Sequence, residues 1–109
     1  MSGPALYLMY AEDVAGSERL RAPLREAHIR RRAELAAEGR VAVSGPLWDQ
    51  DSGAGDYCGS LLVARFDSLE QAQAWADADP YAQAGVYHRM VVRRVNTHFS
   101  QTIHPETPP

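Results

Sequence analysis

The chain has no lysine, a single cysteine and no long apolar run. All eleven of its basic residues are arginine, and its formal net charge is −3 at pH 7. Nucleic-acid-binding domains present a basic face or stripe, so this acidic balance argues against a nucleic-acid partner. The lone Cys58 cannot form a disulfide within the chain, and the sequence therefore gives no reason to expect an oxidising compartment.

The residues at the N-terminus lack the basic region, apolar run and cleavage site of a secretory leader. The apolar stretch from Ala5 to Tyr10 is much shorter than the roughly 20 residues that a membrane-spanning helix needs. We therefore expect a cytoplasmic protein with no membrane partner. The 109 residues leave room for one domain, which we place at residues 1–98, followed by a C-terminal tail at residues 99–109.

Sequence motifs for cofactors and metals are also missing. The chain has no Walker loop, no Rossmann glycine pattern, no zinc-ligand spacing and no nucleophile elbow. We therefore expect no bound cofactor and no metal site. Any chemistry must then come from ordinary side chains acting on a small-molecule ligand.

The hydrophobic pattern predicts four strands and two helical segments. The strands are expected at residues 5–11, 41–44, 59–66 and 86–96, and the helical segments at residues 17–38 and 68–77. Pro23 interrupts the first helical segment, so we expect a short turn at residues 17–21 and a main helix that begins at Pro23. Gly45-Pro46 should end the second strand, and residues 49–55 should form a surface loop.

The order β-α-β-β-α-β is typical of the ferredoxin-like α+β fold, a four-stranded antiparallel sheet with two helices on one face. In the first strand both alternating sets are apolar: Leu6, Leu8 and Tyr10 on one side, Tyr7 and Met9 on the other. A sheet with one wet face should instead alternate apolar and polar residues. We therefore expect a second copy of the chain to cover the other face, giving a homodimeric α+β barrel. The alternative is that short buried strands are apolar throughout for local reasons.

His28 is the first candidate for chemistry. It falls within about 40° of Leu24 and Leu35 at 100° per residue, so it shares their inward stripe on the main helix. Arg21 and Arg25 precede it on nearly the same side. An imidazole at the edge of a core, flanked by guanidinium groups, titrates near or below neutrality and can act as a general base. The alternative is a histidine that only makes a hydrogen bond inside the core.

Asp79 is the second candidate. It is expected at the end of the second helix, where the helix dipole disfavours negative charge by a few tenths to about 1 kcal/mol. Asp77 adds like charge nearby. Trp75 precedes Asp79 by four residues and points along the same side of the helix, so Asp79 should lie near buried surface. Pro80 forces Asp79, the residue before it, out of helical geometry. A carboxylate in such a place is a candidate functional group. The alternative is that Asp-Pro is only a helix stop signal.

Other residues are candidates for ligand binding. Ser44, Gly45 and Pro46 could line the rim of a pocket with backbone groups, although Gly-Pro is often only a turn. Tyr10 at the end of the first strand and Tyr81 after Asp-Pro could donate hydrogen bonds to a ligand. Buried tyrosines also donate hydrogen bonds for structural reasons alone.

From about Leu6 to Val95 the chain resembles the YciI-like (YCII-related) proteins. The matching stretches are Tyr10-Ala11-Glu12-Asp13, the helix with Arg21, Arg25 and His28, Glu38-Gly39-Arg40 leading to Gly45-Pro46, Gly59-Ser60-Leu61, Phe66 to Ala72, and Trp75 to Tyr81 followed by Gly85-Val86-Tyr87. The Ala-Asp-Pro-Tyr and Gly-Val signature is specific. Two departures stand out: Glu26 occupies a position where proline is common, and Arg30–Arg32 place charge where an apolar residue is common.

The resemblance implies a ferredoxin-like fold that dimerises through its sheets. It also implies an active site built from one histidine and one aspartate, which correspond here to His28 and Asp79. The family includes a dehydrochlorinase that acts on a chlorinated hydroxyquinol, and related dimeric barrels include muconolactone isomerases and cofactor-free oxygenases. These activities share proton abstraction from a small ring or carbonyl compound.

We therefore expect a cofactor-independent lyase or isomerase. In this hypothesis His28 takes a proton, Asp79 orients the imidazole, and Arg21 or Arg25 steadies an enolate or carboxylate. The alternative is a non-catalytic dimeric module that binds a small ligand, perhaps one that serves a larger enzyme.

Overall fold

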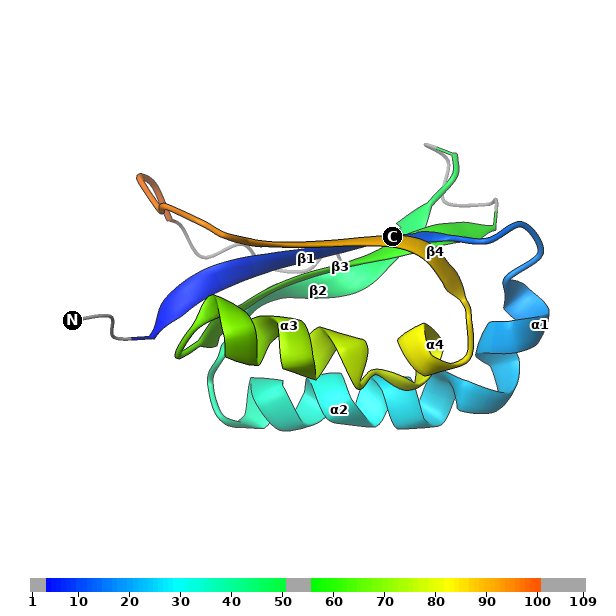
Figure 1. The fold of residues 1–109 in the computed structure, drawn as a ribbon, viewed down its shortest axis with the longest axis horizontal. Coiled ribbons are helices and arrows are strands. Elements are labelled where there is room, and N and C mark those ends of the chain that lie inside the picture. The colour runs from blue at the N-terminus through cyan, green and yellow to red at the C-terminus, as the bar shows by residue number, and fades with distance from the viewer. Residues whose placement is uncertain (1–3, 51–55, 101–109) are drawn as a thin grey trace, which may run out of the picture.

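The computed structural model describes residues 4–50 and 56–100, and Figure 1 shows the arrangement of their elements. The strands are β1 (Ala5–Asp13), β2 (Val41–Trp48), β3 (Tyr57–Phe66) and β4 (Tyr87–Arg94). The helices are α1 (Glu18–Arg21), the 3-10 turn η1 (Ala22–Leu24), α2 (Arg25–Ala37), α3 (Leu69–Asp77) and α4 (Pro80–Gln83). Most of the predicted loop at residues 49–55 and of the predicted tail at residues 99–109 lies outside the described residues.

The strands form one antiparallel sheet in the order β2-β3-β1-β4. The helices all lie on one face of this sheet, below it in Figure 1. This order of elements and this two-layer arrangement confirm the predicted α+β class with ferredoxin-like topology. The two central strands, β1 and β3, therefore form the floor on which the helices pack.

The hydrophobic core fills the space between the sheet and the helices. Tyr7 and Met9 of β1 point into it, and so do their register partners on β3, Ala64 and Leu62. The remaining members of the core are Leu35, Phe66, Ala72, Ala76 and Val92. Because the inward positions of α3 are alanines, that helix can pack closely on the sheet, and its C-terminal end comes near α2.

The main helix begins two residues later than expected. Pro23 lies within η1, and α2 starts at Arg25. Proline has a fixed φ and no backbone N–H, which suits it to the first turn of a helix and to a short 3-10 connection. The start of α3 agrees with the prediction, because Oγ of Ser68 accepts a hydrogen bond from the backbone N–H of Gln71 at 3.1 Å.

The expectation that Gly45-Pro46 ends the second strand is wrong. β2 continues through both residues to Trp48, and Pro46 pairs in register with Ser60 of β3. β2 lies at the edge of the sheet, where one side of the strand makes no ladder hydrogen bonds and a residue without an N–H is tolerated. This longer strand supplies one wall of the site described below.

The face of the sheet opposite the helices carries an apolar patch, and Figure 1 shows no helix over this face. Leu8 of β1 and Val63 of β3 are neighbours on this face, and Tyr10 and Leu61 form the adjacent pair. Val43 of β2, on the same face, is 49% exposed. The structure thus contains apolar residues on this second face, as the apolar side chains at both alternating positions of the first strand indicated. Among the described residues no helix is both long and apolar enough to cross a membrane.

Candidate active site

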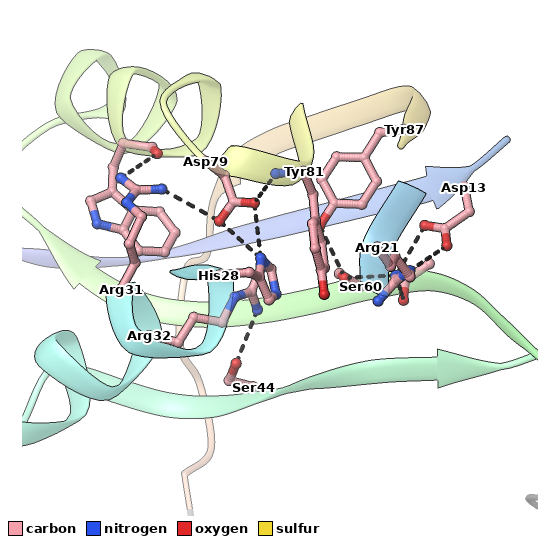
Figure 2. Close-up of polar contacts among 12 residues, drawn as sticks. Asp13, Arg21, His28, Arg31, Arg32, Ser44, Ser60, Asp79, Tyr81 and Tyr87 are labelled. Carbon is pink, nitrogen blue, oxygen red and sulfur yellow. Dashed lines mark hydrogen bonds and ion pairs between the residues drawn. The ribbon is translucent and has the colours of Figure 1, made fainter. Parts of the chain in front are cut away.

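His28 of α2 and Asp79 at the start of α4 meet although they lie 51 positions apart in the chain. Nδ1 of His28 is 2.8 Å from Oδ2 and 3.0 Å from Oδ1 of Asp79. Both residues are buried, with 7% and 2% of their surfaces exposed. Figure 2 shows the imidazole pointing toward the carboxylate. The structure therefore brings together the two residues that the sequence singled out for separate reasons.

The local setting of Asp79 differs from the prediction. It does not end the preceding helix, since α3 stops at Asp77; it is instead the N-cap of α4, whose first residue is Pro80. Oδ2 of Asp79 accepts a hydrogen bond from the backbone N–H of Tyr81 at 2.9 Å. The expected dipole penalty is therefore reversed, because the N-terminal end of a helix favours negative charge. Nη1 of Arg31 also donates to Oδ1 at 3.4 Å.

The protonation states follow from these contacts. Burial raises the pKa of Asp79, but the hydrogen bonds from His28 and Tyr81 together with nearby positive charge hold it below its ordinary value. Burial lowers the pKa of His28, the contact with Asp79 raises it, and the charges of Arg32 and Arg21 lower it, for a net decrease. At neutral pH Asp79 is ionised and His28 is neutral. Because a carboxylate can only accept, Nδ1 carries the proton and Nε2 is left with a free lone pair.

A cavity of about 320 Å³ opens beside the imidazole. The residues that line it are Arg21, Arg25, His28, Ile29, Arg32, Ser44, Gly45, Pro46, Tyr57 and Tyr81. This volume lies at the lower end of the range for small-molecule pockets, roughly 300–1,000 Å³, and suits a compact ligand such as a single ring. Nε2 of His28 has no hydrogen-bond partner among the described residues, so it is available to that ligand.

Tyr81 holds the imidazole from one side. Its ring stacks on that of His28 with a centroid distance of 3.9 Å and an interplanar angle of 12°. The guanidinium of Arg21 lies 4.8 Å from the centroid of the same ring, and Figure 2 shows Tyr81 between His28 and Arg21. Tyr81 is 1% exposed, so this stack restricts the orientation of His28 independently of Asp79.

Arg21 is occupied by protein partners. Its Nε and Nη2 donate to the two oxygens of Asp13 at 2.7 and 3.1 Å, and Nη2 also donates to the carbonyl of Gly59 at 3.0 Å. Ser17 donates to the same carboxylate at 2.6 Å. Arg21 and the side chain of Asp13 are almost fully buried, and buried charges need close pairing of this bidentate kind. Arg21 therefore ties α1 to the sheet. It lines the cavity, but its Nε and Nη2 donors are directed to protein partners.

The other predicted ligand-binding residues separate into two groups. Arg25 borders the cavity and pairs with Glu18 at 2.6 Å near the surface, and the segment Ser44 to Pro46 lines the wall formed by β2. Tyr10 does not border the cavity, because residues on either side of it in β1 point toward the helices and it faces the opposite side of the sheet. Its hydroxyl donates to Glu12 at 3.0 Å.

Sequence reasoning did not propose Arg32 or Tyr57 as lining residues. Arg32 follows His28 by four positions and so lies on the same side of α2, a spacing that would have identified it. Of the three consecutive arginines at residues 30–32, Arg32 is the one that lines the cavity. Tyr57 gives no such signal, because it reaches the cavity only through the pairing of β3 with β2.

Comparison with known proteins places this site in a family. Residues 5–96 match the YCII-related domain. The chain belongs to the YCII-related family. Protein YciI of Escherichia coli O6:H1 is 48% identical over 91 residues, which cover 81% of this chain and 93% of that protein. An uncharacterised protein of Haemophilus influenzae is 34% identical over 90 residues, which cover 80% of this chain and 92% of that protein. The resemblance inferred from the sequence is confirmed.

One solved structure adds an activity within this fold. It is 5-chloro-2-hydroxyhydroquinone dehydrochlorinase (TftG) from Burkholderia phenoliruptrix AC1100, in complex with 2,5-dihydroxybenzoquinone. It matches the YCII-related chain with a TM-score of 0.75 and 28% identity, over 84% of this chain and 93% of that one. The same fold is therefore used by an enzyme that acts on a small molecule. In the part of the chain described by the structure, no group of three or more potential ligands is arranged to hold a metal ion.

Proposed function

We propose that this protein is a cofactor-independent lyase or isomerase in which His28 removes a proton from a small ring compound. The observation that carries the proposal is the 2.8 Å contact between Nδ1 of His28 and Asp79, at the wall of a cavity large enough for one ring. The dehydrochlorinase of the same fold supports it, because removal of hydrogen chloride includes loss of a proton.

In this mechanism Nε2 of His28 accepts the proton while Nδ1–H remains hydrogen-bonded to Asp79. In an elimination, the electron pair left on the substrate forms a new double bond and the leaving group departs as an anion. In an isomerisation, His28 returns the proton to a different carbon. Asp79 stabilises the imidazolium formed in either case, and a positioned base of this kind contributes about 10²–10⁴-fold to the rate.

The first prediction concerns the coupling of the two residues. Asp79→Asn keeps an N-cap for α4 but removes the negative charge, so the pKa of His28 should fall clearly in the variant. NMR titration of the His28 ring protons measures this. His88→Gln, an exposed change on β4, serves as the control. An unchanged pKa in Asp79→Asn would mean that the pair is not coupled.

Turnover separates catalysis from binding alone. Chlorinated hydroxyquinols and ring lactones are incubated with the parent and with His28→Gln, and product formation is followed by chromatography. The proposal expects conversion by the parent and a loss of at least about 10²-fold in the variant. If no compound is converted and His28→Gln changes only ligand affinity, the protein is instead a small-ligand-binding module.

We also propose that the protein is a homodimer that packs through the apolar face of its sheet. The support is the row of apolar side chains on β1 and β3 that no described helix covers, including Leu8, Leu61 and Val63. An apolar patch on a sheet face, bordered by charged residues such as Arg65 and Arg93, is typical of an interaction surface. A second copy related by a two-fold axis offers the same face in return.

A further inference from the structure

The cavity contains one guanidinium that lacks a carboxylate partner. Three arginines line the cavity. Arg21 pairs with Asp13 at 2.7 Å, and Arg25 pairs with Glu18 at 2.6 Å. Arg32 forms no ion pair with any of the described residues. The imidazole of His28 is neutral at pH 7 and adds no charge to the cavity wall. Arg32 therefore leaves the wall with one positive charge that no ion pair compensates.

Within residues 4–50 and 56–100, the hydrogen bonds of Arg32 go only to neutral acceptors. Nη1 donates to Oγ of Ser44 and to the carbonyl of Leu61, each at 3.0 Å, and Figure 2 shows the contact with Ser44. Nε is buried and has no hydrogen-bond partner in the described part of the chain. A guanidinium carries five N–H donors, so most of its capacity is unused. Burial and the charges of Arg21 and Arg31 lower the pKa of Arg32, yet arginine stays protonated at neutral pH.

The rest of the wall is largely apolar. Tyr57 contributes an aromatic ring, and Pro46 and Ile29 add aliphatic surface. Apolar walls with a few fixed polar groups are typical of small-molecule sites, in which the polar groups set the orientation of the ligand. A ring compound would pack against these side chains, and its polar substituent would be left to the charged group.

We propose that the cavity binds a single-ring compound with one anionic oxygen group, and that Arg32 receives that group. The inference rests on the proposed function in that both place the ligand in the same cavity, and it adds the charge of that ligand. An anion of one unit would neutralise the wall, and charge-assisted hydrogen bonds to a guanidinium are among the stronger ones in proteins. Arg32, rather than Arg21 or Arg25, is then the residue that determines this specificity.

Calorimetric titration with a matched pair of probes tests the proposal. Benzoate and benzyl alcohol share a ring and differ in charge, and NMR shifts of the His28 ring locate their binding. The parent should bind benzoate at least about tenfold more tightly than benzyl alcohol. Arg32→Leu should weaken benzoate by about tenfold or more and change benzyl alcohol by less than about threefold. Arg30→Leu removes the same charge from the exposed side of α2 and should leave both affinities unchanged.

Three results would each overturn the proposal. The first is a parent that binds benzoate no more tightly than benzyl alcohol. The second is an Arg32→Leu variant that binds benzoate as tightly as the parent does. The third is an equal loss of affinity for benzoate in Arg32→Leu and Arg30→Leu. If Arg32→Leu does not fold, Arg32→Lys keeps the charge and must keep the preference for benzoate. Benzoate binding that depends on Arg32, in a protein that converts no ring compound, would support this inference while removing the catalytic proposal.

Discussion

At the scale of the residue, three charged or titratable side chains of the cavity wall differ because their partners differ. Arg21 donates to Asp13 and to the carbonyl of Gly59. His28 donates a hydrogen bond from Nδ1 to Asp79. Among the described residues, Arg32 donates to neutral oxygens only. These three side chains of one cavity wall therefore take different roles. Arg21 stabilises the fold, His28 is suited to accept a proton, and Arg32 leaves positive charge for a ligand.

The lowered pKa of His28 predicts a pH dependence of stability. Because burial holds this pKa below the value of about 6.5 in the unfolded chain, the unfolded state binds the proton first as the pH falls. The free energy of unfolding should be greatest above about pH 6.5 and decrease below it. Urea unfolding at pH 7.5 and pH 5.5 measures the change. His28→Gln should remove most of the decrease, whereas His88→Gln should retain it; equal slopes in both would contradict the assignment.

The sequence predicted which side of the main helix faces inward, but it did not identify every residue on that side. The 3.6-residue period placed His28 toward the core, and the same period extends to Arg32. Asp79 was identified for a reason that the structure reverses, since a four-residue helix follows it. Such a helix is too short to leave a periodic signal, so its N-cap could not be recognised from hydrophobic pattern alone.

At the scale of the element, Gly59 controls how closely β3 approaches β1. A Cβ at this position would collide with the carbonyl oxygen of Ala11 and approach a methyl group of Leu47 at 3.3 Å. The carbonyl of Gly59 also accepts the hydrogen bond from Arg21 that joins α1 to the sheet. A larger residue here would move the strand and the anchor of Arg21 together.

Gly59→Ala should therefore be destabilising. Overpacking of this kind costs about 1–3 kcal/mol, because backbone rather than a flexible side chain must move. Chemical unfolding monitored by circular dichroism gives the value. Gly45→Ala is the matched control, since a Cβ at Gly45 meets nothing within 4 Å, and it should change the free energy by less than about 1 kcal/mol. Equal effects of the two substitutions would show that the close approach to Ala11 does not matter.

The elements themselves were largely predictable because their signals are local. Short apolar runs predicted the strands, and the helical segment predicted to begin at residue 68 matches α3, whose N-cap is Ser68. The end of β2 was missed because the tolerance for Pro46 depends on the position of the strand in the sheet. Sequence order does not reveal an edge strand until the pairing is known.

At the scale of the whole molecule, the two faces of the sheet have different tasks. One face carries the core and the cavity, and the other presents apolar residues that the described helices leave uncovered. Burial in a dimer would remove that surface from water, which is favourable at roughly 25 cal/mol per Å² before the costs of association. The dimer proposed above is therefore separable from the cavity by substitution.

Val63→Glu tests this separation. It places a charge at the centre of the face, beside Leu8, and should shift the protein from twice its 12.0 kDa chain mass to a monomer. Light scattering after size exclusion gives the mass. Leu69→Glu adds the same charge at an exposed apolar position on α3 and should leave the dimer intact. A monomeric parent at micromolar concentration would rule out the proposed homodimer.

Besides its longer contact with Arg31, the carboxylate of Asp79 serves two partners at once: it caps α4 and accepts a hydrogen bond from His28. This constrains how the position can diverge during evolution. Alanine would remove both contacts and cost the cap about 1 kcal/mol, whereas asparagine would keep the cap and remove only the negative charge. A lineage that lost the proton-transfer role while keeping the fold should therefore carry Asn, Ser or Thr here. The residue found at this position in a homologue thus indicates which of the two roles has been under selection.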